Sequence, residues 1–484
     1  MSVSFSRRRV LLVALSTSRG DLPHTPPLGL MYLAACLRRS QPDAFVDIID
    51  QKITEVTDRE IAARCLEGQF GVVGLSLFTP AVMRARRIAG EIHRQGGDAV
   101  VVAGGPHVSS FMEDGLAPEF DYGVFGEGEE VFAKLVARLA DGQAPDDTSG
   151  LLYRRDGAVL AGTPRPPIQP LDGLPQPAWD LIDLRQYWKR DSFGLMGRRP
   201  YASVFTSRGC PFRCSYCHSI FGKRFRGRSP ENVLAEMEFL ASHERVAEFE
   251  LVDDCFNFDR ARALAIFGLI RARLPGVRLL FPNGLRTDLL DAEFIEAMAA
   301  AGTYYISVAV ESASPRVQST CGKALNLEKV RKNIELCSKQ RIFLNGYFMF
   351  GFPGETRAEA EETIAFATGS KLHTASFFFL TPFKGTAVYE HLTAAQKDAM
   401  QGNVERMMYD HQSFNLTAMT KTELAAVQRL AFRRFYLRPG LLFRTARAHP
   451  RPLHAAVSFA KEMLTKASSQ IMDRLVWRKE TALP

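Results

Sequence analysis

Long apolar runs are missing from this chain. No stretch of about 18 consecutive apolar residues occurs among its 484 residues, so the sequence predicts no membrane-spanning helix. The arginines at 7–9 and the apolar residues at 10–15 imitate a secretion signal. Because no small-residue cleavage site follows them, we interpret 10–15 as a first strand and expect a cytoplasmic protein.

Cysteine is also scarce. Of eight cysteines, three fall within eight residues at 210–217, and the other five are scattered along the chain. That distribution argues against a disulfide framework and fits a reducing compartment. We interpret the scattered cysteines as packing residues, with Cys255 as the exception because it sits at the end of a strand predicted at 248–252.

Acidic residues are sparse near the carboxyl end. Between positions 429 and 480, twelve Lys and Arg residues stand against three acidic ones, which accounts for the whole net charge of +8. The remainder of the chain is near neutral, so we expect no nucleic-acid partner. The segments 444–451 and 455–466 predict basic amphipathic helices. Their charged face is either simply solvated or in contact with the anionic inner face of a membrane.

The first 140 residues alternate apolar strands with helical patterns. Strands are predicted at 10–15, 46–49, 72–77, 99–103 and 122–125, and helices at 28–39, 57–66, 81–95 and 129–139. This alternation predicts a doubly wound, Rossmann-like α/β domain with a parallel sheet over residues 1–140. No Gly-x-Gly-x-x-Gly follows the first strand, which disfavours a dinucleotide site.

Three of these strands end in residues that suit a ligand site. The ends are Ser76-Leu77-Phe78-Thr79, Gly104-Gly105-Pro106-His107 and Gly126-Glu127-Gly128-Glu129. Parallel sheets bind ligands at the carboxyl ends of their strands, where glycine lets a ligand approach the backbone. The alternative is that these glycines only make tight turns.

The remaining chain divides into three parts. Residues 141–200 are rich in Pro and Gly and predict a connector, with a hairpin at 151–153 and 158–160 around Asp156-Gly157. Residues 201–388 contain six strand–helix repeats, which predict a partial (βα)6 barrel whose chemistry lies at the carboxyl ends of its strands. Residues 389–484 lose this rhythm and predict a helical tail.

The three clustered cysteines lie in Arg208-Gly209-Cys210-Pro211-Phe212-Arg213-Cys214-Ser215-Tyr216-Cys217-His218, directly after the first barrel strand. Nearby arginines and Lys223 suit thiolates that hold a soft metal centre. Four interpretations compete: covalent haem attachment, which requires export; a zinc site with His218 as fourth ligand; coincidental packing; and an iron–sulfur cluster on three cysteines.

The spacing Cys-x-x-x-Cys-x-aromatic-Cys resembles the cluster motif of radical S-adenosylmethionine (SAM) enzymes. The resemblance implies that Cys210, Cys214 and Cys217 hold a [4Fe–4S] cluster whose fourth iron binds SAM. It also implies SAM contacts from residues of the motif and of later strand ends: Tyr216, Asp253, Glu311, Gly346 and Gly351. At most one of the adjacent carboxylates at 253 and 254 faces the cavity, and Glu311 has a salt bridge to Arg286 or Lys323 as its alternative.

The N-terminal strand ends resemble the cobalamin-binding domain that precedes many radical SAM barrels. Ser76-Leu77 followed by Gly104-Gly105 carries the resemblance, which implies a cobalamin site formed by Ser76, Thr79, Gly104, Gly105, Gly126 and Glu127. The Asp-x-His-x-x-Gly motif of methionine-synthase-like relatives is missing. We therefore expect cobalamin to bind without a protein histidine beneath the cobalt.

Together these motifs resemble the cobalamin-dependent radical SAM enzymes over nearly the whole chain. The resemblance implies reductive cleavage of SAM and methylation of an unactivated carbon, or of a phosphinate, in a small or lipid-like metabolite. It also implies an electron donor such as flavodoxin or ferredoxin. Two alternatives stay open: oxidative cyclisation or ring rearrangement, as in anaerobic magnesium-protoporphyrin ester cyclase, and a non-catalytic cobalamin- or zinc-binding regulator.

Overall fold

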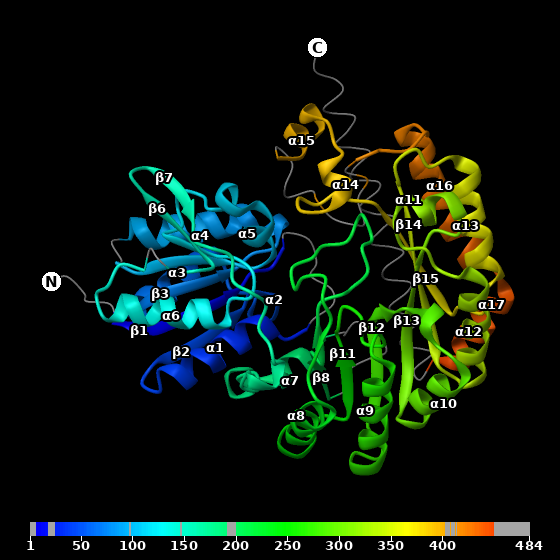
Figure 1. Ribbon diagram of the computed structural model, residues 1–484, viewed down its shortest axis with the longest axis horizontal. Coiled ribbons are helices and arrows are strands. Elements are labelled where there is room, and N and C mark those ends of the chain that lie inside the picture. The colour runs from blue at the N-terminus through cyan, green and yellow to red at the C-terminus, as the bar shows by residue number, and fades with distance from the viewer. Residues whose placement is uncertain are drawn as a thin grey trace.

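The computed structural model describes residues 6–17, 25–95, 98–145, 148–190, 200–401 and 414–449, together with residues 407 and 412. Two α/β domains stand side by side, joined by the segment that carries α7 (Figure 1). Helices of the C-terminal region pack on the outer side of the second domain (Figure 1).

The N-terminal domain is built on a seven-stranded sheet of order β2-β1-β3-β4-β5-β6-β7. Its parallel strands are β1 (Ser6–Ala14), β2 (Phe45–Asp50), β3 (Phe70–Ser76), β4 (Val100–Gly104) and β5 (Tyr122–Val124). Helices α1 (Leu28–Ser40) and α6 (Glu129–Ala140) pack together with one face, while α3 (Asp58–Glu67) and α4 (Val82–Arg94) cover the other. The predicted doubly wound domain is confirmed.

The strand order reverses between β1 and β3, since β2 lies on one side of β1 and β3 on the other. Such a switch point is where doubly wound sheets bind ligands. The predicted hairpin also forms, as β6 (Leu151–Arg155) and β7 (Ala158–Ala161). It pairs antiparallel with β5, so the sheet continues past the boundary that we set at residue 140. The reason is backbone pairing: β5 would otherwise leave an unpaired edge.

The rest of the connector packs against both domains. The backbone N–H of Ala178 donates to the carbonyl of Met31 in α1, and the Trp179 indole donates to the buried Glu236 carboxylate of α8 (Pro230–His243). Helix α7 (Leu184–Trp188) carries Tyr187, whose hydroxyl donates to Asp50 at the end of β2 at 2.8 Å. One hydrophobic core therefore continues from the first sheet into the second.

The second sheet has six parallel strands in the order β15-β14-β13-β12-β11-β8, with β8 and β15 at its edges. The strands are β8 (Tyr201–Val204), β11 (Glu248–Leu251), β12 (Arg278–Leu285), β13 (Thr303–Glu311), β14 (Phe343–Phe350) and β15 (Thr374–Phe379). Helices α8, α9 (Arg260–Arg273), α10 (Ala292–Ala300), α12 (Leu327–Lys339) and α13 (Arg357–Gly369) alternate with them. The predicted partial barrel is confirmed.

Local sequence signals set the beginnings of the barrel helices. Ser229 caps α8 just before Pro230, and Asp259 and Asp291 cap α9 and α10 by accepting from backbone N–H groups. Thr356 and Glu359 form a reciprocal capping box at the start of α13. These caps fix where each helix leaves the carboxyl end of the preceding strand.

The C-terminal region contributes α14 (Ala387–Glu390), α15 (Ala394–Gln401), α16 (Lys421–Tyr436) and α17 (Pro439–Ala448). Helix α16 packs on α13 and β15. Helix α17 begins earlier than predicted because Pro439 suits a first helical position, and the helix predicted at 455–466 lies outside the described residues. In the described ranges, no helix has both the length and the apolar character needed to span a membrane.

Candidate active site between the two domains

The three clustered cysteines lie on one loop between two short antiparallel strands, β9 (Ser207–Arg208) and β10 (Arg226–Gly227). Gly209 has a φ of +81°, and a Cβ there would stand 2.3 Å from the carbonyl oxygen of Arg224. Only glycine allows the two ends of the loop to approach this closely. We call residues 209–225 the cysteine loop.

Two neighbouring segments brace the cysteine loop through backbone hydrogen bonds. The N–H of Ser215 donates to the carbonyl of Cys321 at 2.8 Å, and the N–H of Val388 donates to the carbonyl of Ser215 at 2.9 Å. The Tyr216 ring meets Phe352 edge-on, with centroids 5.7 Å apart. The segment after α11 (Pro315–Thr320), the turn after β14 and α14 therefore converge on the cysteines.

The three half-buried thiols have different environments. A hydrogen bond from the Cys255 thiol lowers the pKa of Cys210 to about 6. Burial raises the pKa of Cys217 to about 12 and also raises that of Cys214. Cys255 thus contacts the cysteine loop. This agrees with the expectation that Cys255, unlike the other scattered cysteines, is more than a packing residue.

The possible metal donors on the cysteine loop are three thiols and the His218 imidazole. Within the described ranges, no three His, Cys, Asp or Glu side chains gather around one point as a mononuclear metal site requires. His218, the fourth ligand of the zinc alternative, is exposed. Three thiols spread along one loop suit a cluster, whose irons are held by separate cysteines.

Asp253 and Asp254 follow β11 and hold the base of the cysteine loop. Asp253 is fully buried, and one carboxylate oxygen accepts from the Thr206 N–H at 2.9 Å, the Thr206 hydroxyl at 3.0 Å and the Ser207 hydroxyl at 2.6 Å. The Asp254 carboxylate accepts from the Gly209 N–H at 3.2 Å. This oxygen orients the loop, because strand neighbours β8 and β11 bring it beneath residues 206–207. The other Asp253 oxygen is buried without a hydrogen-bond partner among the described residues, and the SAM contact at Asp253 stays a prediction.

Glu311 ends β13 in a strained conformation, with a φ of +65°. Its carboxylate pairs with the Lys323 ammonium at 2.8 Å, and both side chains are buried. The salt-bridge alternative to Lys323 is therefore present, whereas Arg286 pairs with Asp288. The buried pair lies next to the cysteine loop, since a Cβ on Gly322 would stand 2.9 Å from the Arg213 carbonyl oxygen.

The two glycines predicted to contact SAM, Gly346 in β14 and Gly351 directly after it, have different surroundings. A Cβ on Gly346 would stand 2.6 Å from Leu372 and 2.7 Å from Phe348, so Gly346 lies on the helix-covered face of the sheet. The prediction of a SAM contact there is wrong in orientation, because successive residues of a strand face opposite sides. Tyr347 and Met349 face the barrel interior instead.

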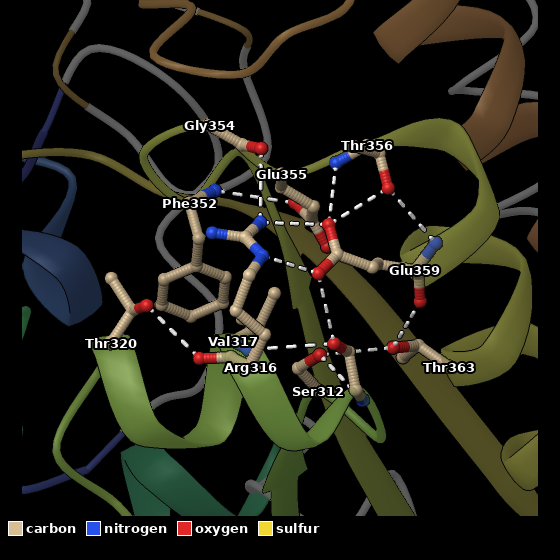
Figure 2. Close-up of polar contacts among 11 residues, drawn as sticks. Ser312, Arg316, Val317, Thr320, Phe352, Gly354, Glu355, Thr356, Glu359 and Thr363 are labelled. Carbon is tan, nitrogen blue, oxygen red and sulfur yellow. Dashed lines mark hydrogen bonds and ion pairs between the residues drawn. The ribbon is translucent and has the colours of Figure 1, made fainter.

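The turn after β14 is held by a buried carboxylate (Figure 2). Glu355 accepts from the N–H groups of Gly351 at 2.7 Å and Phe352 at 3.2 Å. Burial raises the pKa of Glu355 to about 7. Figure 2 also shows the Arg316 guanidinium between the Glu359 carboxylate and the Gly354 carbonyl. Gly351, with a φ of +112°, thus keeps a defined backbone position beside Phe352 and Tyr216.

The three predicted strand ends of the N-terminal domain lie together, because β3, β4 and β5 are neighbours. Gly105 has a φ of +95°, and a Cβ there would stand 3.1 Å from the backbone of Leu77. The Thr79 hydroxyl meets His107 Nδ1 at 3.3 Å. A Cβ on Gly126 would meet nothing within 4 Å, so this turn, at a φ of +75°, leaves space for a ligand beside its backbone.

Two polar residues at this edge differ from the prediction. Glu127 has other partners than the predicted cobalamin, and His107 was not predicted as a site residue. The Glu127 carboxylate binds both guanidinium nitrogens of Arg226 and also Arg208, so its side chain is not available to cobalamin. His107, stacked on Phe111 at 4.3 Å, was not predicted as a site residue; burial lowers its pKa to about 4 and keeps it neutral.

The barrel closes on this edge through the segment after β15. The Lys384 ammonium pairs with Asp114 at 2.6 Å and lies 4.9 Å from the Phe111 ring centre. Gly385 lies against Ser110. The carboxyl ends of both sheets therefore face one another at the cysteine loop.

The sequence comparisons agree with this arrangement. A model of the radical SAM superfamily matches residues 204–367, and a model of the B12 binding domain matches residues 13–136. The uncharacterized methyltransferase PH0819 of Pyrococcus horikoshii is 33% identical over 428 residues, which cover 88% of this chain and 90% of that relative. The chain belongs to the cobalamin-binding radical SAM enzymes.

Other members differ in chemistry. The anaerobic magnesium-protoporphyrin IX monomethyl ester cyclase of Rubrivivax gelatinosus is 28% identical over 437 residues, or 86% of this chain and 75% of the cyclase. The solved structure of the methyltransferase TsrM from Kitasatospora setae, with cobalamin and a [4Fe–4S] cluster bound, shares the fold at a TM-score of 0.66 and 22% identity, covering 78% of this chain and 73% of that one. As a radical SAM enzyme with a B12 domain, this protein uses a [4Fe–4S] cluster, SAM and cobalamin.

Proposed function

We propose that this enzyme methylates an unactivated carbon, or a phosphinate phosphorus, of a small or lipid-like metabolite. One observation carries the proposal: the glycine-lined edge of the B12 domain and the cysteine loop of the barrel are held against each other. Lys384 and Asp114 join them on one side, and Glu127 and Arg226 join them on the other. A methyl donor at one edge and a radical source at the other would share one substrate.

The residues divide the work by their chemistry. When bound, the cluster supplies an electron to SAM and cobalamin supplies the transferable methyl group. We assign the cluster to Cys210, Cys214 and Cys217. The Tyr216 and Phe352 rings form an apolar wall that excludes water beside the cysteines.

The polar contacts to SAM come from the strand ends of the barrel. The Glu311–Lys323 pair offers a carboxylate and an ammonium next to the cysteine loop, which suit the polar groups of SAM. The backbone at Gly351 lies beside the same aromatic wall. For cobalamin we assign Ser76, Thr79, Gly104, Gly105 and Gly126, largely through their backbone.

The second candidate is oxidative cyclisation, which the cyclase relative of Rubrivivax gelatinosus favours. The two reactions consume SAM differently. Reduced holoenzyme is incubated with SAM and candidate substrates, and both SAM products are quantified. Methylation predicts S-adenosylhomocysteine and 5′-deoxyadenosine together, whereas 5′-deoxyadenosine without S-adenosylhomocysteine would favour cyclisation. Membership of an enzyme family removes the non-catalytic regulator as an explanation.

We also propose two partners. A low-potential carrier such as flavodoxin or ferredoxin would supply the electron. Contact with an anionic membrane surface is supported by Leu437 and Phe443, which are 74% and 71% exposed and lie among arginines at the end of α16 and on α17. Replacing both by Ser should reduce co-sedimentation with anionic vesicles; unchanged co-sedimentation would remove the membrane from the proposal.

A further inference from the structure

Four charged side chains are buried where the B12 domain meets the base of the cysteine loop. One carboxylate comes from the turn after β5, one from the first residue of α6, and two guanidinium groups come from β9 and β10: Glu127, Glu129, Arg208 and Arg226. Their side chains are between 3% and 7% exposed. We call these four residues the junction cluster.

The strongest contact in the junction cluster is a two-point pair. Arg226 Nη2 lies 2.7 Å from Glu127 Oε1, and Arg226 Nη1 lies 2.9 Å from Glu127 Oε2. The same carboxylate accepts from the backbone N–H of Ile168 at 2.5 Å. A two-point guanidinium–carboxylate pair fixes direction as well as distance. Glu127 therefore ties the B12 domain, the connector and one end of the cysteine loop to a single geometry.

Arg208 makes the matching contact at the other end of the loop. It donates to Glu129 at 2.5 Å and lies 3.3 Å from Glu127. Its guanidinium also lies 5.2 Å from the ring centres of Tyr32, in α1, and Phe221, in the cysteine loop. Both ends of the cysteine loop are thus held by carboxylates of the B12 domain, one in the turn after β5 and one at the start of α6.

That turn is also a proposed cobalamin contact. Gly126, with open space beside its backbone, directly precedes Glu127 in the chain. A shift of the cysteine loop would move Arg208 and Arg226, and the buried pairs would carry the shift to Gly126. The reverse holds when a ligand moves Gly126, because neither charge can separate from its partner without remaining buried and unpaired.

From this geometry we propose that the junction cluster couples the two cofactor sites, with Glu127 and Arg226 as its positioning residues. Cobalamin binds more tightly when the cysteines hold their cluster, and the cluster is retained better when cobalamin is bound. Reciprocity of the two effects is a thermodynamic requirement. The proposal rests on the binding of both cofactors and not on methyl transfer.

The test measures hydroxocobalamin affinity by absorbance, before and after reconstitution of the iron–sulfur cluster, in the wild-type enzyme and in Glu127→Gln. We expect the wild-type affinity to rise on reconstitution by a factor of roughly 5 to 150, the usual range of coupling between sites. Glu127→Gln should bring this factor close to one. Iron retention during dialysis should improve with hydroxocobalamin in the wild type and not in the variant.

Glu130→Gln is the matched control. It makes the same charge change three residues further along the chain, in α6. Its partner Arg165 lies at the surface, and the Glu130 side chain is 51% exposed. It should keep the wild-type factor. If Glu127→Gln does not fold, Arg226→Lys keeps the charge, loses the two-point contact and should lower the factor likewise.

Two results would overturn the proposal. A coupling factor in Glu127→Gln or Arg226→Lys equal to that of the wild type would show that the junction cluster carries no coupling. A wild-type enzyme whose hydroxocobalamin affinity does not change with the cluster would show that there is no coupling to carry. Either result leaves methyl transfer untouched, which the SAM products test separately.

Discussion

The two edges that face each other at the active site are built differently, one mainly from backbone conformation and the other from side-chain contacts. At the edge of the B12 domain, backbone conformation dominates: Gly105 and Gly126 both have positive φ values, Gly105 packs closely against the Leu77 backbone, and Gly126 borders open space that a ligand could enter. At the edge of the barrel, buried carboxylates at the ends of β11 and β13 each bind a specified partner. The comparison teaches that one site depends on space and the other on a network of side chains.

The largest expected effect is the loss of one cysteine. Cys210→Ala, and equally Cys214→Ala or Cys217→Ala, removes a proposed cluster ligand and should abolish 5′-deoxyadenosine formation from SAM. Hydroxocobalamin binding should stay within a few fold of wild type, because the B12-domain edge does not use thiols. Equal loss of 5′-deoxyadenosine formation and of hydroxocobalamin binding would mean that the variant is misfolded. It would also mean that the two edges cannot be disrupted independently.

Breaking the ion pair of the barrel edge should cost stability first. Glu311→Gln leaves the buried Lys323 ammonium unpaired, which should lower the free energy of unfolding by about 3 kcal/mol. In the double variant Glu311→Gln/Lys323→Met, stability should return while SAM affinity stays low. Denaturant unfolding and equilibrium SAM binding measure the two effects. If the double variant recovered both stability and SAM affinity, Glu311 would be only the ion-pair partner of Lys323 and not a SAM contact.

The turn after β14 predicts a pH dependence. Burial raises the pKa of Glu355 from 4.5 to about 7, so the folded state binds this proton more tightly than the unfolded state does. Its contribution to stability is complete below pH 4.5 and is lost as the pH rises towards 7, a change of about 3 kcal/mol.

Glu355→Gln should therefore flatten the stability profile between pH 4.5 and 7. Urea unfolding across this range compares the variant with Glu361→Gln, a control on the exposed surface of α13 whose partner is Arg357. A wild-type profile that rises with pH in this window and is unchanged in Glu355→Gln would contradict the assignment.

The smallest effect should come from the B12-domain edge. Gly126→Ala places a methyl group in open space at a φ of +75°, so it should cost about 1 kcal/mol of stability through its backbone alone. Gly142→Ala has the same backbone cost at a φ of +67° and also meets nothing within 4 Å. Hydroxocobalamin affinity should fall about tenfold in Gly126→Ala and stay unchanged in Gly142→Ala. Equal affinities would remove Gly126 from the site.

The architecture could be predicted from the sequence because its signals are local. The six barrel strands, from β8 to β15, all form within residues 201–388, where six strand–helix repeats were predicted. Alternating apolar strands and helices with clear caps leave few other arrangements. The hairpin β6–β7 was also predicted, but its pairing with β5 depends on which edge of the sheet is free, and the sequence does not say that.

The site was predicted less completely because its contacts are distant along the chain. Arg226 pairs with Glu127, which lies 99 residues away in the sequence, so no local sequence pattern predicts the pair. The orientation of Gly346 depends on which face of β14 each alternate residue takes, and glycine has no side chain to show it. Asp253 was placed at the correct strand end, but its partners come from the neighbouring strand connection at residues 206–207.

The most direct test of the account is a count of both cofactors on one chain. After anaerobic reconstitution with iron, sulfide and hydroxocobalamin, elemental analysis and absorbance should give roughly four irons and about one cobalamin per chain. The triple variant with Ala at positions 210, 214 and 217 should lose the iron and keep the cobalamin. Zinc in place of iron, or iron without cobalamin in the wild type, would contradict the account.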